Sequence, residues 1–273
     1  SHIREVDAIG HVVRIFEDEN ILHVSNRIDP VEDIEVINLE LVLADLQVVT
    51  KRLGSVERDV KAGLKEAKHE QAGLTKIKAA LEAGEAARGV TLTEDEEKEV
   101  KKLTLLTTKK MMYILNAKSG GKNLDELNDE RWQRLVAFLK DSGAEYVLVD
   151  ASTESDVRTL SPEDRAAMLA DLDVRGGIDD VILGGYRLLD LITYFTTGAD
   201  ETRAWTIARN STAPVAGTAI HTDFYDKFIR AEVVFWKDLI DSGGYAKARE
   251  KGLVRTEGKE YIVKDGDVIE FKI

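Results

Sequence analysis

Three polar loops follow apolar, strand-like runs and hold the residues best suited to chemistry. They span residues 17–27, 116–121 and 151–156. In open parallel sheets, ligands bind beyond the carboxyl ends of the strands, so we expect these loops at one edge of a sheet. Amide, hydroxyl and imidazole groups from Asn116, Ser152 and His23 can hydrogen-bond a ligand there, and an imidazole can act as a general base.

Each loop also has a structural interpretation, which the sequence leaves open. His23 lies among Ile21, Leu22 and Val24 and can be a packing residue. The segment Asn116-Ala117-Lys118-Ser119 can be an ordinary connection from a strand to a helix. Ser152 or Thr153 can cap a helix that begins at Glu154, because serine and threonine favour that position.

The sequence argues against a metal centre. It contains no cysteine, which excludes disulfides and cysteine-based metal or redox sites. His221 and Asp223 lie close together, but no second histidine occurs at ligand spacing, so they cannot form a closed site. Thr222 and Asp223 are better interpreted as the start of a short helix. We therefore expect no metal ligands in this chain.

Composition indicates an ordinary globular protein of two or three domains. Hydrophobic residues make up 43% of the 273 residues and charged residues 33%. No apolar run approaches the ~20 residues that span a bilayer, and no secretory signal is visible. The expectation is a cytoplasmic protein with no membrane partner.

Residues 29–107 are predicted to form a long antiparallel helical arm. Pro30 marks its start, and a turn at Gly63 or Gly73 would form its tip. From Leu39 onward, apolar residues recur at alternating spacings of three and four, which predicts a seam for a partner helix. The seam residues are Leu39, Val42, Leu46, Val49, Leu53, Val56 and Val60. A second stripe of Ile34, Ile37 and Leu41 predicts that the start of the helix is buried on two sides.

The arm is locally basic in an acidic chain. The net charge is −13, yet residues 51–80 hold 8 basic and 4 acidic side chains. Such a cluster can bind RNA phosphates with salt-dependent affinity, and Lys61, Lys65 and Lys68 are the candidate contacts. The alternative is a solvated helix face, because nearby acidic residues such as Glu66 and Glu70 can form intrahelical ion pairs.

Strands and helices alternate on either side of the arm, which predicts a parallel sheet with helices on both faces. The predicted strands are 11–16, 111–117 and 145–151, and the predicted helices are 126–140, one from Pro162, and 178–195. Three short strands make a poor independent sheet, so we expect the remaining strands upstream of Ser1. After Thr196, short strands, one crossing helix and a hairpin turning at Asp265-Gly266 suggest a β-grasp module.

Three blocks of sequence resemble the YchF / Obg-like ATPase family of P-loop nucleotide hydrolases. They are SHIREVDAIGHVVRIFEDENILHVSNRIDPVEDIEVINLEL (1–41), IHTDFYDKFIRAEVVFWKDLI (220–240) and EGKEYIVKDGDVIEFKI (257–273). The resemblance implies an α/β fold: a partial P-loop NTPase (Rossmann-like) parallel sheet, an inserted antiparallel coiled-coil arm and a C-terminal β-grasp TGS domain. The implied domains are 1–28 with 108–195 for the nucleotide (G) domain, 29–107 for the arm and 196–273 for the TGS domain.

The resemblance also implies residue roles. Asn116 begins the loop that reads the nucleotide base, and Ala117, Ser119, Ala151 and Ser152 complete the implied binding set. In the family the fourth position of this loop is glutamate, whereas here it is Ser119, which leaves the choice of ATP or GTP open. Because an apolar residue replaces the usual water-orienting glutamine in this family, His23 becomes the candidate catalytic residue.

The implied activity is hydrolysis of ATP or GTP with Mg²⁺ by a ribosome-associated enzyme. The 273 residues contain no G-x-x-x-x-G-K-[ST] motif. We therefore expect this chain to supply the base side of the pocket, to need an N-terminal P-loop segment as partner, and to be inactive alone. The alternative function is a non-enzymatic adaptor that binds RNA or the ribosome.

Overall fold

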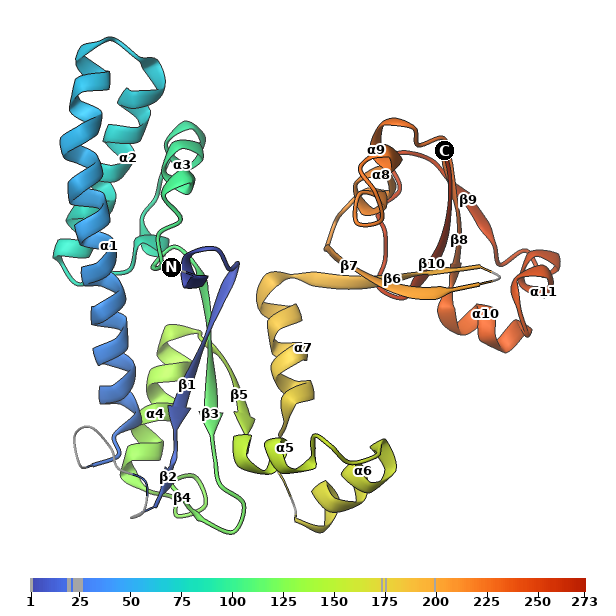
Figure 1. Ribbon diagram of the computed structural model, residues 1–273, viewed down its shortest axis with the longest axis horizontal. Helices are drawn as coiled ribbons and strands as arrows, with labels where there is room; N and C mark the ends of the chain where they lie inside the picture. Colours follow the sequence, from blue (N-terminus) through green and yellow to red (C-terminus); the bar gives the residue numbers. More distant parts are fainter. Residues whose placement is uncertain (1, 19–20, 22–26, 173, 175, 199) are drawn as a thin grey trace. The chain divides into compact units, whose positions relative to one another are not determined.

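The computed structural model describes residues 2–18, 21, 27–172, 174, 176–198 and 200–273. The chain divides into two compact units, Ser1–Leu188 and Leu189–Ile273 (Figure 1). The first unit contains the predicted helical arm and the predicted parallel sheet. The second contains a mixed sheet.

The sheet of the first unit is parallel, as predicted. In the described residues it has the order β1 (Ala8–Arg14), β3 (Lys110–Asn116), β5 (Glu145–Val149). Figure 1 shows the three strands running in the same direction. A short antiparallel pair, β2 (Phe16–Glu17) with β4 (Lys122–Asn123), extends this sheet region. The carboxyl ends of the three strands therefore meet at one edge.

Helices cover the two faces of this sheet unequally. Helices α1 (Pro30–Lys61) and α4 (Glu130–Ser142) cover one face, where Val13, Leu115 and Leu135 are buried. Helix α7 (Ile178–Leu189) covers β3 and β5 on the other face. On β1 that second face is bare, because Val12 is 58% exposed. The outer edge of β1 has no partner strand among the residues that the structure describes.

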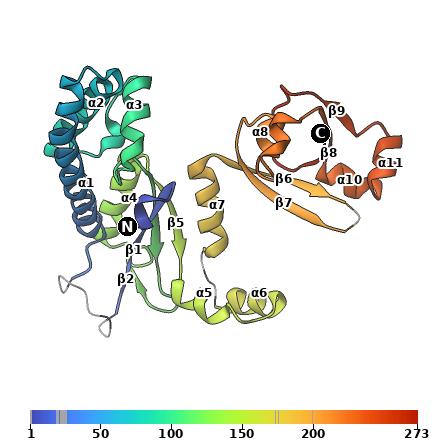
Figure 2. The same ribbon diagram turned by 45° about the horizontal axis from the view of Figure 1, so that its top comes forward.

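The arm is a helical hairpin of α1 and α2 (Lys65–Glu82), with α3 (Glu94–Val100) packed beside α2 (Figure 2). Gly63 forms the turn, with φ +83, which confirms one of the two predicted positions. Gly73 instead lies within α2, where an added Cβ would lie 2.9 Å from Val100 Cγ2. This glycine therefore lets α3 approach closely. Thr93 and Glu96 form a capping box at the start of α3.

The predicted seam is correct over the distal part of α1 and wrong at its base. Val42, Val49 and Val56 are buried, and the first two pack with Leu74, Ile77 and Leu81 of α2. Leu39 of the seam and Ile37 of the second stripe are instead exposed, whereas Ile34 of the second stripe is buried as predicted. The reason is length: at 1.5 Å per residue, α2 spans about 27 Å and α1 about 48 Å. Near its base α1 packs on the sheet and α4, and the two exposed residues point away from both.

Two shorter helices follow β5 in the first unit. Helix α5 (Ala151–Val157) begins directly after the strand, and α6 (Pro162–Asp171) starts with Ser161 as N-cap and proline at its first position, as predicted. The helix predicted over 126–140 begins only at Glu130, because Asp129 caps it.

The second unit holds a mixed sheet with the order β7-β6-β10-β8-β9 in the described residues. Its strands are β6 (Leu191–Thr197), β7 (Thr202–Ala208), β8 (Arg230–Phe235), β9 (Arg255–Glu257) and β10 (Asp267–Lys272). Its helices are α8 (Ala213–Gly217), α9 (Asp223–Asp226), α10 (Trp236–Ser242) and α11 (Tyr245–Glu250). Tyr194, Val233 and Ile269 are buried in the core between this sheet and its covering segments.

Two predictions fail in this unit. The helix predicted over 178–195 ends at Leu189, because the β-branched and aromatic run Leu191–Thr197 pairs with β7. The predicted hairpin over 261–273 does not form. Strand β10 pairs with β8 and β6 instead, and Gly266 (φ +83) only turns the chain into it.

Candidate functional site

The carboxyl edge of the parallel sheet brings two of the three predicted loops together. Ile15 N donates to Asn116 O at 3.0 Å, and Ala117 N donates to Val149 O at 2.8 Å. These backbone bonds continue the strand pairing past the strand ends. The segments that follow β1, β3 and β5 are therefore held side by side at this edge.

Asn116 joins the loops after β3 and β5. Its Oδ1 accepts a hydrogen bond from Ala151 N at 3.1 Å. Because the oxygen is engaged, the Nδ2 group is the part of the side chain left to donate to a ligand. Through this bond Asn116 bridges the loops after β3 and β5.

Asp150 organises the same edge, and sequence reasoning missed it. Its carboxylate accepts from Ser119 N at 2.7 Å, Thr153 N at 3.0 Å and Thr153 Oγ1 at 2.7 Å. Burial alone would raise the pKa of Asp150, but these hydrogen bonds hold that pKa below its ordinary value. Asp150, not Ser152 or Thr153, is the N-cap of α5, which begins at Ala151 rather than Glu154.

Asn123 fixes the loop that carries Ala117 and Ser119. This buried side chain accepts from Lys118 N at 2.9 Å and donates to Lys118 O at 2.9 Å. An ion pair joins Lys118 to Asp18 after β1. An added Cβ at Gly121 would lie 3.0 Å from Lys118 O, so a larger residue would be crowded in this tight turn. The loop is thus positioned before any ligand binds.

A cavity of about 230 Å³ opens at this edge. Its lining residues are Ala117, Lys118, Ser119, Gly120, Asn123, Glu126, Asp150 and Leu172. Ala117 and Ser119 are thus in its wall, whereas Asn116, Ala151 and Ser152 lie in the adjoining segments. Glu126 was predicted only as a helix residue, yet it brings a carboxylate to the cavity and accepts from Asn123 Nδ2 at 3.2 Å.

His23 lies outside the described residues. The chain on either side of its segment is anchored to the start of α4: Arg131 donates to Glu17 at 2.7 Å and to Ile28 O at 3.0 Å. The same guanidinium hydrogen-bonds Asp129, and this bond, more than any other contribution, lowers the pKa of Asp129 to about 2.

No cluster of three or more metal-ligating side chains occurs in the part of the chain that the structure describes. His221 instead accepts a hydrogen bond from Asp223 N at 3.2 Å near the start of α9. No helix in the described ranges is long and apolar enough to cross a membrane.

The arm divides its basic residues into paired and unpaired groups. Arg52 binds Glu70 through two 2.6 Å hydrogen bonds between α1 and α2, so Glu70 is not the intrahelical partner that the sequence suggests. The side chains of Lys61, Lys65 and Lys68 are exposed and have no ion-pair partner among the described residues. These three lie around the tip of the hairpin.

The parallel sheet, its helices and the loops at its carboxyl edge define an α/β protein of the kind that binds ligands beyond its strand ends. Comparison with known proteins makes the class specific. The model of the YchF-GTPase_C family, described as a protein of unknown function (DUF933), matches residues 191–273.

Relatives match the whole chain. The ribosome-binding ATPase YchF of Bacillus subtilis (strain 168) is 45% identical over 273 residues, which is 100% of this chain and 74% of that protein. The protein of the same name from Escherichia coli O157:H7 is 43% identical over 272 residues, 99% of this chain and 74% of that protein. The solved structure of the Schizosaccharomyces pombe YchF GTPase is 30% identical with a TM-score of 0.81, covering 99% of this chain and 73% of that chain. The chain belongs to the YchF family.

Proposed function

We propose that this chain forms the base side of a nucleotide-hydrolysing site in a ribosome-associated enzyme that uses ATP or GTP. The bond from Ala151 N to Asn116 Oδ1 carries the proposal, because it orients an amide donor beside the cavity at the sheet edge. The names of the relatives, ribosome-binding ATPase and GTPase, support it. We further propose the coiled-coil arm over 29–107, the TGS domain over 196–273 and the nucleotide domain over 1–28 and 108–195.

In this proposal the nucleotide base enters the cavity beside Asn116. The Nδ2 group donates to a ring nitrogen of the purine, while the backbone of Ala117 and Ser119 and the start of α5 at Ala151 and Ser152 border the base. The Ser119 hydroxyl can donate or accept, so it tolerates either purine. A preorganised loop favours binding because little conformational entropy remains to be lost.

Glu126 is proposed to supply the carboxylate that Ser119 lacks. The Watson–Crick edge of guanine presents two adjacent N–H donors, whereas that of adenine presents one donor and one acceptor. A carboxylate at the cavity wall therefore favours guanine, and each oxygen can accept more than one bond. This assigns the base preference to a residue outside the four-residue loop.

Substitutions at Asn116 and at Glu126 are expected to have different effects on nucleotide binding. Asn116→Ala should weaken binding of both adenosine and guanosine about tenfold or more, through loss of a donor and of the loop bridge. Glu126→Gln should weaken guanosine binding more than adenosine binding. Titration calorimetry or NMR titration measures both, with the exposed amide change Gln133→Ala as control. Equal affinities for the wild type and Asn116→Ala would contradict the proposal.

Hydrolysis is expected to need more than these residues. Phosphoryl transfer depends on groups that position and stabilise the phosphates, and the 273 residues contain no P-loop motif. Mg²⁺ is proposed to arrive with the nucleotide and the P-loop segment. The open edge of β1 supports a further strand, carried by that segment, as the partner at this edge.

The purified 273-residue chain should therefore show no ATPase or GTPase turnover.

Mixed with or joined to a P-loop segment of the family, the chain should gain turnover. His23→Ala should then lower this turnover by ~10²-fold or more while nucleotide affinity stays nearly unchanged. Phosphate release assays measure both. Turnover by the 273-residue chain that survives repeated purification would refute the expectation that this chain is inactive alone. Unchanged turnover in His23→Ala would show that this histidine has a packing role.

The second candidate function is a non-enzymatic adaptor for RNA or the ribosome. The unpaired lysines at the arm tip favour it, because such a surface needs no nucleotide. If the chain joined to a P-loop segment still lacks turnover but binds RNA, the adaptor function stands and the enzyme proposal falls.

A further inference from the structure

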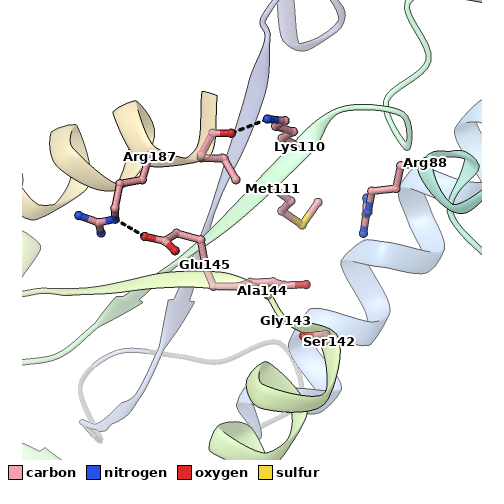
Figure 3. A pocket seen from close by; sticks show the side chains of 10 residues that line it. Arg88, Lys110, Met111, Ser142, Gly143, Ala144, Glu145 and Arg187 are labelled. Atoms are coloured by element: carbon pink, nitrogen blue, oxygen red, sulfur yellow. Dashed lines mark hydrogen bonds and ion pairs between the residues drawn. The ribbon is translucent and has the colours of Figure 1, made fainter. Parts of the chain in front are cut away.

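A second cavity lies at the opposite, amino end of the same sheet (Figure 3). Its volume is about 440 Å³. It is formed where β3 and β5 begin, between the end of α4, the end of α7 and the turn at Ala87–Gly89. The lining residues are Arg88, Lys110, Met111, Tyr113, Ser142, Gly143, Ala144, Glu145, Arg187 and Leu188.

The charge of this lining is opposite to that of the chain. Arg88, Lys110 and Arg187 contribute three positive charges and Glu145 one negative charge, a balance of +2 in a protein of net charge −13. The carboxyl ends of α4 and α7 also lie here, and each adds about half a negative charge. The balance stays positive after both are subtracted. The helix ends and Glu145 therefore neutralise part of the positive charge of Arg88, Lys110 and Arg187, but not all of it.

The three cations differ in how far they are already engaged. Arg187 donates through Nε to Glu145 at 2.7 Å, and Lys110 donates to Leu188 O at 2.8 Å. A lysine ammonium has three donors and an arginine guanidinium five, so both retain donors for a ligand. The Arg88 side chain has no hydrogen-bond or ion-pair partner among the residues that the structure describes.

Arg88 is presented from a fixed backbone. Its N–H donates to Thr107 O at 3.1 Å, and Ala87 N donates to Thr107 Oγ1 at 3.2 Å. Figure 3 shows Arg88 on one side of the cavity, facing Lys110, Glu145 and Arg187 across it. Arg88 also lines an adjoining cavity of about 360 Å³ together with Lys101. An unpaired guanidinium on an anchored turn between two cavities is suited to bidentate contact with phosphate oxygens.

We infer that this cavity binds a small phosphorylated molecule, with its phosphate between Arg88 and Lys110. Met111, Tyr113 and Leu188 offer an apolar surface to the rest of the ligand. Lys110 and Asn116 lie six positions apart along β3, about 20 Å at 3.3 Å per residue. The site is therefore separate from the proposed base site and independent of it.

Titration of the ¹⁵N-labelled 273-residue chain with inorganic pyrophosphate tests the inference. We expect saturable shifts of the amide signals of Arg88, Lys110 and residues 142–145. Arg88→Ala and Lys110→Met should each weaken binding tenfold or more, and Lys98→Ala, which removes an exposed cation elsewhere, should change it less than twofold. Asn116→Ala should leave pyrophosphate binding unchanged. The experiment therefore tests this cavity separately from the proposed base site.

Three outcomes would overturn the inference. They are the lack of saturable binding, binding that Arg88→Ala leaves intact, and shifts that gather elsewhere on the chain. An eight-nucleotide RNA serves as a further arm, because its backbone offers the same phosphate chemistry. If this RNA binds more tightly than pyrophosphate and loses affinity in Arg88→Ala, the cavity belongs to an RNA surface and the small-molecule assignment is wrong.

Discussion

Replacement of Asp45 by alanine is expected to lower the free energy of unfolding of the first unit by about 3–5 kcal/mol. Asp45 lies on α1 and is fully buried. It accepts from Leu106 N at 3.0 Å, Thr107 N at 2.7 Å, Thr107 Oγ1 at 2.8 Å and Arg4 at 3.0 Å. Alanine would leave the Leu106 and Thr107 amides and the Thr107 hydroxyl buried without this acceptor. The carboxylate therefore fixes the middle of α1 to the segment that enters β3.

Urea unfolding followed by the fluorescence of Trp132, in a background with Trp205 and Trp236 replaced by phenylalanine, measures this effect. Hydrogen exchange of the Leu106 and Thr107 amides should also accelerate by ~10²-fold or more. Asp45→Asn retains one acceptor oxygen and should fall between wild type and Asp45→Ala. The exposed change Asp141→Ala serves as control. A loss below about 1 kcal/mol in Asp45→Ala would show that Asp45 does not anchor the arm.

Charge reversal at the arm tip is expected to weaken RNA or ribosome binding strongly. The triple change Lys61→Glu, Lys65→Glu and Lys68→Glu removes three exposed, unpaired cations. If each contacts a phosphate, the slope of log affinity against log salt should decrease by about 2–3, and affinity at low salt should fall well over tenfold. Filter binding or sedimentation with ribosomes across a salt series measures both quantities.

A matched triple change on the second unit provides the control. Lys247, Lys251 and Lys259 are also exposed, so their reversal to glutamate produces the same change in net charge. If the tip is the binding surface, this second triple should leave the salt slope nearly unchanged. If the second triple has the larger effect, the nucleic-acid surface lies on the C-terminal unit instead.

The periodicity of the sequence predicts elements well where a single neighbour decides burial. The distal seam of α1 is correct because α2 runs alongside it and supplies Leu74, Ile77 and Leu81 to the same cluster. At Leu39 the same periodicity fails, because α2 is too short to cover this part of α1. The length of α2 is not encoded in the sequence of α1. The run 191–195 continues the leucine and isoleucine content of the helix before it, but its β-branched and aromatic residues favour the strand that pairs with β7.

The residues at the carboxyl edge of the parallel sheet also differ in how far the sequence predicts them. Asn116 was identifiable because it follows a buried strand and matches a family motif. Asp150 could have been identified as an N-cap three residues before Thr153, but its bond to Ser119 N joins two loops that are distant in sequence. Glu126 carries no local signal at all, because its place in the cavity wall depends on how the chain turns at Asn123. Tertiary contacts of this kind are formed by the fold.

The most direct test of the nucleotide proposal is to locate where a nucleoside binds. Adenosine and guanosine at millimolar concentration are titrated into the ¹⁵N-labelled 273-residue chain, and amide shifts are mapped. If the base binds at this edge, saturable shifts should occur at Asn116 to Ser119 and Asp150 to Ser152 and should be reduced in Asn116→Ala. Shifts that spare this edge and gather elsewhere, or no saturable binding of either nucleoside, would contradict the proposal.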